Sequence, residues 1–105
     1  VRWSSPEVIT HGRFGEKSDV WAFGVLLWEI WSECQIPFCL QPDDGKVAEL
    51  VCVERKVLKR PPQCSDDVHS LMTRCWAYKA KDRPTFNQLR QDLDAVIESA
   101  LLARE

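Results

Sequence analysis

The sequence predicts a mainly α-helical domain in which four to five helices surround a buried central helix. Apolar side chains recur at helical spacing from Val20 to Trp31 and cover almost the whole circumference of that helix, which is typical of burial on most sides. Pro37 and the pair Pro61-Pro62 divide the rest of the chain into further helical patterns, and no segment has the clear alternation of a strand. The length of 105 residues suits one modest domain.

The central helix is expected over residues 19–32. Ser18 or Asp19 is the expected N-cap, because a short polar side chain at that position accepts a hydrogen bond from the first turn. Residues 35–44 are expected to be a loop. A second long helix should run from about Asp44 to Arg55, with an apolar face made of Val47, Leu50 and Val51.

Two more helices follow the proline pair. Ser65 is the expected cap of the first, and Asp66 and Asp67 then lie favourably in its first turn. The inner face of that helix is expected to contain Val68, Leu71, Met72 and Cys75. The last helix should start near Pro84-Thr85 and align Phe86, Leu89, Leu93, Val96, Ile97 and Leu101.

The charge balance gives no reason to expect nucleic acid or an anionic membrane as a partner. The chain has 14 basic and 16 acidic side chains and a formal net charge of −2. The longest apolar stretch is shorter than the ~20 residues that span a bilayer and contains Glu29, so no direct membrane insertion is expected. No signal peptide is recognisable either.

The cysteines favour reduced thiols over a disulfide framework or a metal site. Their number is odd and no C-x-x-C pair occurs, whereas disulfide frameworks favour even counts and zinc sites favour close pairs. A cytosolic, reducing compartment is therefore expected. The cysteines are Cys34, Cys39, Cys52, Cys64 and Cys75.

Three segments resemble a known family. They are R-W-S-S-P-E at residues 2–7, K-S-D-V-W-A-F-G at residues 17–24 and D-R-P-T-F at residues 82–86. In this order and spacing they resemble the closing third of a protein kinase catalytic domain, and Trp3 resembles the tyrosine-specific branch. Residues 70–78 are similar to focal adhesion kinases, while residues 21–25 and 37–38 are similar to discoidin receptors and Tec-type kinases.

The resemblance implies that residues 1–105 are a single partial domain, the C-terminal part of the large lobe. Residues 1–17 would hold the end of the activation segment and a short helix, 19–32 the central helix and 44–101 the remaining helices. The glycine-rich loop, the strand lysine, the H-R-D loop and the D-F-G metal site of a kinase precede such a segment. None of these motifs occurs here, so no catalytic, cofactor or metal residue is expected, and the chain alone should bind no ATP or magnesium and be inactive.

The parent protein is expected to be a tyrosine kinase that uses ATP and magnesium to phosphorylate a tyrosine-containing protein substrate. This segment would provide the peptide-substrate floor and contact the remainder of the kinase domain. The parent would act in the cytoplasm, or at the cytosolic side of a membrane if it is a receptor. The alternative is a non-catalytic helical interaction module, from a pseudokinase or a truncated product.

The resemblance assigns scaffold roles to five residues. Glu7 and Arg83 would form a buried ion pair, although two solvated charges are the alternative for any such pair in isolation. Asp19 would anchor the catalytic loop as well as capping its helix. Leu26 and Ile30 would anchor the apolar column under the adenine site, or simply form core within this chain.

Val1, Arg2, Trp3 and Ser4 match the peptide-substrate loop, although Trp3 could also only pack against the helices. Arg55 stands where many tyrosine kinases have glycine, which removes an easy left-handed end for the preceding helix. Without its neighbours, the segment is expected to expose apolar surface around Trp21 and Leu26.

Overall fold

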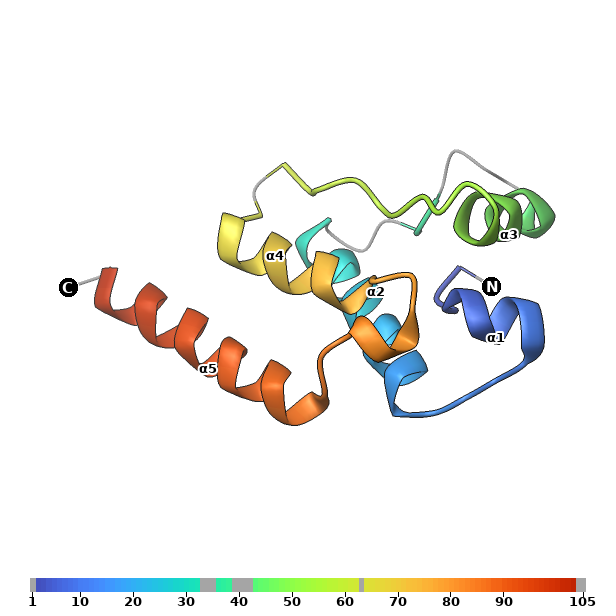
Figure 1. The fold of residues 1–105 in the computed structure, drawn as a ribbon. Coiled ribbons are helices and arrows are strands. Elements are labelled where there is room, and N and C mark those ends of the chain that lie inside the picture. The colour runs from blue at the N-terminus through green and yellow to red at the C-terminus, as the bar shows by residue number, and fades with distance from the viewer. Residues whose placement is uncertain (1, 33–35, 39–42, 63, 104–105) are drawn as a thin grey trace.

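A computed structural model describes residues 2–32, 36–38, 43–62 and 64–103. These residues contain no strand, and the prediction of a mainly helical fold is confirmed (Figure 1). The elements are α1 (Pro6–His11), α2 (Glu16–Trp31), α3 (Asp44–Cys52), α4 (Asp66–Cys75), the short 3-10 helix η1 (Ala80–Asp82) and α5 (Phe86–Ala103). Half of the loop expected at 35–44 lies outside the described residues.

Helix α2 begins one turn earlier than the sequence predicted. Its N-cap is Gly15, which has an extended backbone, and neither Ser18 nor Asp19 takes that position. The Ser18 hydroxyl instead reaches back to Gly15, accepting from its N–H and donating to its carbonyl at 2.7 Å each. Ser18 therefore closes the first turn from inside the helix, and Asp19 lies within that turn.

Helices α2 and α4 cross closely at Gly24. A Cβ atom on Gly24 would lie 2.7 Å from Cys75 Cβ and 2.8 Å from Trp76 Nε1, closer than real side chains approach. The absence of a side chain at Gly24 thus sets the distance between the two helices. Figure 1 shows α2 behind α4, with α1 and α3 together at one side and α5 extending away from the other.

The core lies between α2, α4 and α3. From α2 it contains Val20, Trp21, Val25 and Trp28, and from α4 and its end Val68, Leu71, Met72, Cys75 and Trp76. Val47 and Val51 of α3 belong to the same cluster, as the sequence predicted, whereas Leu50, expected on the same face, is only half-buried. Each buried aliphatic or aromatic side chain contributes roughly 1.5–3 kcal/mol, so this cluster is the main stabilising element.

The prediction that α2 is buried on most sides is wrong at one face. Leu26 is 49% exposed and Ile30 62% exposed, and Trp31 is also exposed. Trp21, in contrast, is only 5% exposed, so the apolar surface expected around Trp21 and Leu26 occurs at Leu26 alone. The helical periodicity of apolar residues predicts an apolar surface correctly. It does not indicate whether the side chains that cover this surface belong to this chain.

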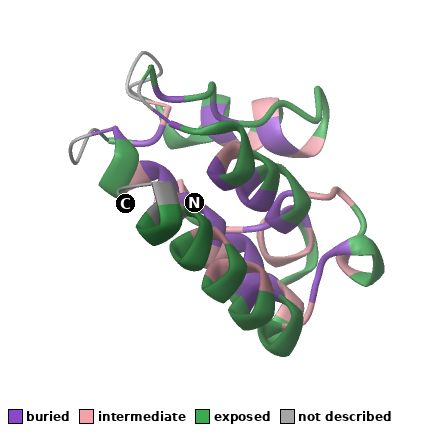
Figure 2. Ribbon diagram, turned by 90° about the vertical axis from the view of Figure 1, so that its left-hand side faces the viewer, coloured by how far each residue is buried: buried purple, intermediate pink, exposed green. Residues whose placement is uncertain are grey.

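The ends of α3 and α5 also differ from expectation. Helix α3 stops at Cys52, three residues before Arg55, whose φ of 55° lies in the left-handed region. Helix α5 buries Leu89, but Phe86, Ile97 and Leu101, which the sequence aligned with it, are exposed. Ile97 and Leu101 lie in the C-terminal half of α5, which extends beyond the core. Figure 2 shows this helix as mostly exposed. The cap of α4 is as predicted, with the Ser65 hydroxyl accepting from the Val68 N–H at 3.3 Å.

Candidate functional site

Glu7 and Arg83 form a two-pronged ion pair between α1 and the segment before α5. Arg83 Nη1 lies 2.7 Å from Glu7 Oε2, and Arg83 Nη2 lies 2.8 Å from Glu7 Oε1. The Arg83 side chain is fully buried, whereas the Glu7 side chain is 21% exposed. The structure therefore brings together the two residues that the resemblance paired, in the parallel geometry that suits a guanidinium and a carboxylate.

Arg83 uses all five of its N–H donors. Besides the two bonds to Glu7, it donates to three backbone carbonyls: Ala77 at 2.8 Å, Lys17 at 3.1 Å and Tyr78 at 3.0 Å. A guanidinium has five donors and no acceptor, so this buried group has no unsatisfied hydrogen. One side chain thus connects α1, the start of α2 and the segment that leads from α4 to η1.

Two further contacts hold this junction. The Arg83 guanidinium lies 5.0 Å from the centroid of the Trp21 ring, within the range of a cation–π interaction. The Lys17 ammonium donates to the Arg83 carbonyl, so Lys17 and Arg83 bond to each other's backbone.

The environment of Glu7 keeps its carboxylate charged. Burial raises the pKa of Glu7, but hydrogen bonds, first of all from Arg83, together with the Arg83 charge, lower it by more. The net pKa lies below the ordinary value of 4.5. The ion pair is therefore intact at neutral pH.

Contacts of Arg2 and Trp3 hold the described part of the expected substrate loop, residues 2–4. Val1 lies outside the described residues. Arg2 Nη1 donates to the carbonyls of Pro37 and Phe38, at 2.9 Å each. Arg2 Nε also lies 3.5 Å from Asp44 Oδ1 at the start of α3. These contacts tie the loop to the turn that follows α2.

Trp3 is joined to α2 itself. Its indole N–H donates to Glu29 Oε1, while the residue as a whole remains 43% exposed. Trp3 is therefore only partly buried against the helices, and its place in a substrate loop stays a prediction. Ser4 is half-buried between this contact and the N-terminus of α1.

The other expected anchors lie at the surface of this chain. Asp19 is exposed in the first turn of α2, where its charge is favourable for the helix dipole. Leu26 and Ile30 lie one turn apart on the exposed face of α2, so they are not core within the described chain. Among the described residues, no hydrogen bond or ion pair joins these three residues to Glu7, Arg83 or Trp3.

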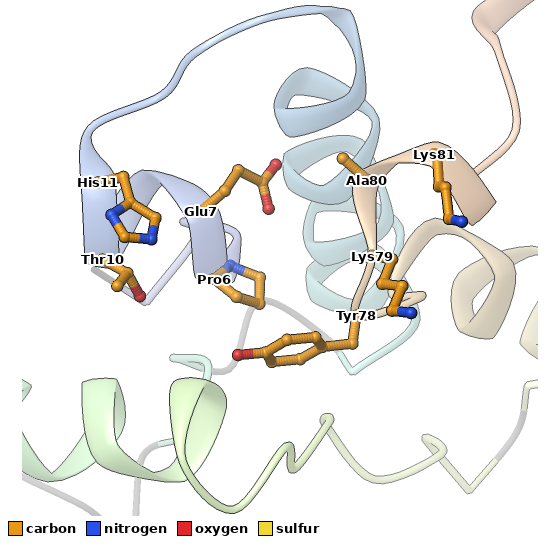
Figure 3. A pocket seen from close by; sticks show the side chains of 8 residues that line it. All are labelled: Pro6, Glu7, Thr10, His11, Tyr78, Lys79, Ala80 and Lys81. Atoms are coloured by element: carbon orange, nitrogen blue, oxygen red, sulfur yellow. The ribbon is translucent and has the colours of Figure 1, made fainter.

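A cavity of about 370 Å³ separates α1 from the residues that follow α4. Figure 3 shows Thr10 and His11 on one wall, while Lys79 and Lys81 extend away from α1. The Tyr78 hydroxyl is engaged in donating to the Cys52 carbonyl at 3.0 Å. The cavity thus has no convergent set of polar groups that would define a catalytic site.

The described residues contain no metal-binding cluster. No group of three or more His, Cys, Asp or Glu side chains in this part of the chain is arranged to hold a metal ion. Cys52, Cys64 and Cys75 are free thiols, and burial raises the pKa of Cys75 to about 11. Cys34 and Cys39 lie outside the described residues.

Several contacts of the site were not predicted from the sequence. Glu29, the carbonyls of Pro37 and Phe38, and the pair of Arg55 with Tyr78 were not among the expected site residues. The Arg55 guanidinium lies 4.2 Å from the centroid of the Tyr78 ring. The sequence offers one signal that Glu29 has a particular role, because Glu29 is the one charged residue between Val20 and Trp31.

Comparison with known proteins agrees with this geometry. Residues 1–93 match the sequence model of a family described as "Protein tyrosine and serine/threonine kinase". The helical fold of the described residues is consistent with the helical C-terminal lobe of such a kinase. The chain belongs to the protein tyrosine and serine/threonine kinase family.

The curated relatives are tyrosine kinases or are named as inactive ones. The chain is 43% identical to human "Inactive tyrosine-protein kinase 7" over 94% of its length and 9% of that protein. It is 42% identical to the transforming protein Fps of avian sarcoma virus (strain PRCII), over 91% of the chain and 18% of Fps. Mouse Fer is 37% identical over 91% of the chain and 11% of Fer. The chain therefore spans less than a fifth of each of these relatives.

Proposed function

We propose that the full-length protein containing this chain is a tyrosine kinase, which transfers the γ-phosphoryl group of ATP to a tyrosine hydroxyl of a protein substrate. The observation that supports the proposal is the hydrogen bond by which α2 holds the loop that contains Trp3. This loop precedes α1, which the Arg83 junction holds in place. Kinases accelerate phosphoryl transfer mainly by positioning and electrostatic stabilisation. This chain supplies the positioning of the substrate side.

The kinase family implies that the full-length protein uses ATP and magnesium. The chain lacks the glycine-rich loop and the metal-binding motifs, and no described cluster fits a metal ion. Both would be held by other parts of the full-length protein. The role of this chain is limited to the floor on which the substrate peptide lies.

The tethered loop suits a tyrosine better than a serine. A phenolic hydroxyl lies farther from its own backbone than a serine hydroxyl, so the substrate backbone must be held farther from the catalytic base. The position of residues 2–4 would set that distance, and an error of about 1 Å can cost about 100-fold in rate. The partner is accordingly a tyrosine-containing protein, together with the rest of the kinase domain.

The compartment we propose is the cytoplasm, or the cytosolic side of a membrane. ATP is a cytosolic substrate for protein kinases, and the free thiols of Cys52, Cys64 and Cys75 fit a reducing environment. Across the described ranges, no helix combines the length and the apolar character needed to cross a bilayer.

A phosphotransfer assay tests the proposal. The full-length protein, given ATP–magnesium and poly(Glu,Tyr) copolymer, should produce phosphotyrosine above a no-enzyme control. A correctly folded preparation that neither binds ATP nor transfers phosphate would contradict it.

A specific observation favours a second candidate, an inactive kinase that acts through protein contacts. Human, mouse and chicken relatives at 42–43% identity are named "Inactive tyrosine-protein kinase 7". The contacts of Arg83 and Trp3 do not depend on catalysis. An active kinase and an inactive one would therefore share the structure of this chain. The phosphotransfer assay separates them.

A further inference from the structure

The cavity beside α1 combines an apolar lining with basic groups at its edge. Pro6 is buried, and Ala80 and Tyr78 are half-buried, so these three side chains give the cavity apolar walls. Lys79 and Lys81 also line the cavity, and both are exposed. The volume of about 370 Å³ lies within the range of ligand pockets, which is roughly 300–1,000 Å³.

The one acidic side chain that lines this cavity is already neutralised. Both carboxylate oxygens of Glu7 accept from the buried Arg83, at 2.7 and 2.8 Å. Asp82 follows Lys81 in η1 but does not line the cavity. Neither Lys79 nor Lys81 takes part in a salt bridge among the described residues. The lining therefore sets no free carboxylate against the two lysine ammonium groups, and the cavity favours an anionic ligand.

The hydrogen-bond donors of the cavity stand on opposite walls. His11 is the last residue of α1, and its imidazole has a ring N–H to donate. Lys79 and Lys81 belong to the other wall and extend away from α1 (Figure 3). One small anion cannot contact groups that diverge in this way, whereas a chain with several carboxylates can span both walls. The spread of the donors thus points to an acidic peptide rather than to a free anion such as phosphate.

Both walls are fixed by contacts with the end of α3. The Tyr78 hydroxyl donates to the Cys52 carbonyl at 3.0 Å, and the Arg55 guanidinium lies 4.2 Å from the centroid of the Tyr78 ring. On α1, the Thr10 hydroxyl donates to Cys52 Sγ at 3.4 Å. Cys52 is the last residue of α3. The cavity is therefore formed before a ligand arrives, which lowers the cost of ordering its walls on binding.

We propose that this cavity, with His11, Lys79 and Lys81 as its donors, is a docking site for an acidic segment of a protein partner. Carboxylates of the segment pair with the two lysines and with the His11 ring, and their aliphatic stems lie on Pro6 and Tyr78. The site contains no residue of the expected substrate loop and needs no phosphotransfer. It is therefore independent of the proposed tyrosine kinase activity.

Fluorescence anisotropy of the full-length protein with a labelled octaglutamate peptide, which has no tyrosine for the proposed substrate site, tests the docking site. Lys79→Ala/Lys81→Ala should weaken binding about tenfold, because two exposed ion pairs are lost. His11→Ala, on the opposite wall, should weaken it about threefold through the loss of one hydrogen bond. The matched control Lys46→Ala/Lys59→Ala removes the same charge at exposed positions outside the cavity and should leave the affinity nearly unchanged.

Four results would overturn the proposal. Absence of peptide binding by the unsubstituted protein would show that there is no such site. Equal losses in the two double-lysine variants would mean nonspecific attraction to a positive surface. An affinity unchanged by Lys79→Ala/Lys81→Ala or by His11→Ala would place the peptide elsewhere. Inorganic phosphate that displaces the peptide better than sodium chloride of equal ionic strength would indicate a simple anion site. Absence of phosphotransfer, in contrast, would refute only the proposed kinase function.

Discussion

Arg83 shows at the scale of one residue why an arginine rather than a lysine is needed at the junction. It bonds to one carboxylate and three carbonyls from different segments, and its side chain is fully buried. A lysine ammonium has three donors on a flexible stem and could not satisfy all of these acceptors. The planar fork therefore fixes the relative positions of α1, α2 and the segment before α5.

Removing this side chain should destabilise the protein strongly. Arg83→Ala leaves the Glu7 carboxylate and three carbonyls without their donor, and breaking a buried pair costs roughly 3–5 kcal/mol. Thermal unfolding of the full-length protein measures the effect. The control is Arg90→Ala, at an exposed position of α5, which should leave the melting temperature nearly unchanged. Equal melting temperatures for both variants would contradict the account of the junction.

The lowered pKa of Glu7 predicts a pH dependence with a definite sign. Because the pKa in the folded protein lies below the ordinary 4.5, the stabilisation is fully present above that pH and is lost as the pH falls through the folded-state pKa. Glu7→Gln lacks this titration. The stability difference between the unsubstituted protein and Glu7→Gln should therefore shrink below about pH 4.5, as urea unfolding at several pH values would measure. A difference that is constant from pH 7 to pH 3 would show that Glu7 is not held charged by Arg83.

At the scale of the elements, the crossing of α2 and α4 depends on Gly24. Gly24→Ala would gain about 1 kcal/mol in helix propensity, but the new Cβ would press on Cys75 and Trp76 in a packed core. Overpacking typically costs ~1–3 kcal/mol, so a net loss of stability is expected in thermal unfolding. Gly45→Ala is the matched control, since its Cβ would meet only the flexible Asp43 carboxylate, at 3.3 Å. Stabilisation by Gly24→Ala would mean that the helices are farther apart than described.

The end of α3 shows how a non-glycine residue keeps a left-handed backbone. Arg55 has a φ of 55°, its guanidinium stacks on Tyr78, and the Lys56 N–H donates to the Leu50 carbonyl at 2.9 Å. Arg55→Ala keeps the strained backbone and loses the stacking, whereas Arg55→Gly relieves the strain. The glycine variant should therefore be more stable than the alanine variant by about 1 kcal/mol in thermal unfolding. The reverse order would indicate that this backbone is not strained.

The elements were predictable where the signal is local. The Ser65 cap and the inner face of α4 follow from short polar and periodic apolar residues, and both occur as expected. The start of α2 was missed because Ser18 acts from inside the helix on Gly15. The exposure of Leu26 and Ile30 was missed because helical periodicity reports apolar character and not the partner that covers it.

The candidate site also combines contacts that were predicted from the sequence with contacts that were not. The pairing of Glu7 with Arg83 was expected from the family resemblance, and its two-pronged geometry required the structure. The contact of Trp3 with Glu29 joins residues 26 positions apart. The position of Glu29 in an apolar stretch sets this residue apart in the sequence, but it does not indicate which residue is its partner. Long-range polar contacts of this kind are therefore the part that sequence reasoning could not supply.

At the scale of the whole molecule, the chain is part of a kinase domain, and its helix α2 exposes an apolar face at Leu26 and Ile30. The isolated 105-residue chain should neither bind ATP–magnesium nor phosphorylate poly(Glu,Tyr), because the phosphate-binding and metal-binding motifs are absent from its sequence. Isothermal titration and a radiometric assay on the purified chain would check this. Phosphotyrosine formed by that chain would contradict it, provided that a parallel mock purification forms none.

The most direct test of the central claim, that this scaffold serves a tyrosine-specific kinase, is phosphoamino-acid analysis of the autophosphorylated full-length protein. The account predicts phosphotyrosine, with phosphoserine and phosphothreonine essentially absent, because the proposed substrate loop, which contains Trp3, would hold the substrate backbone at the distance that a phenolic hydroxyl needs. Predominant phosphoserine or phosphothreonine would contradict it.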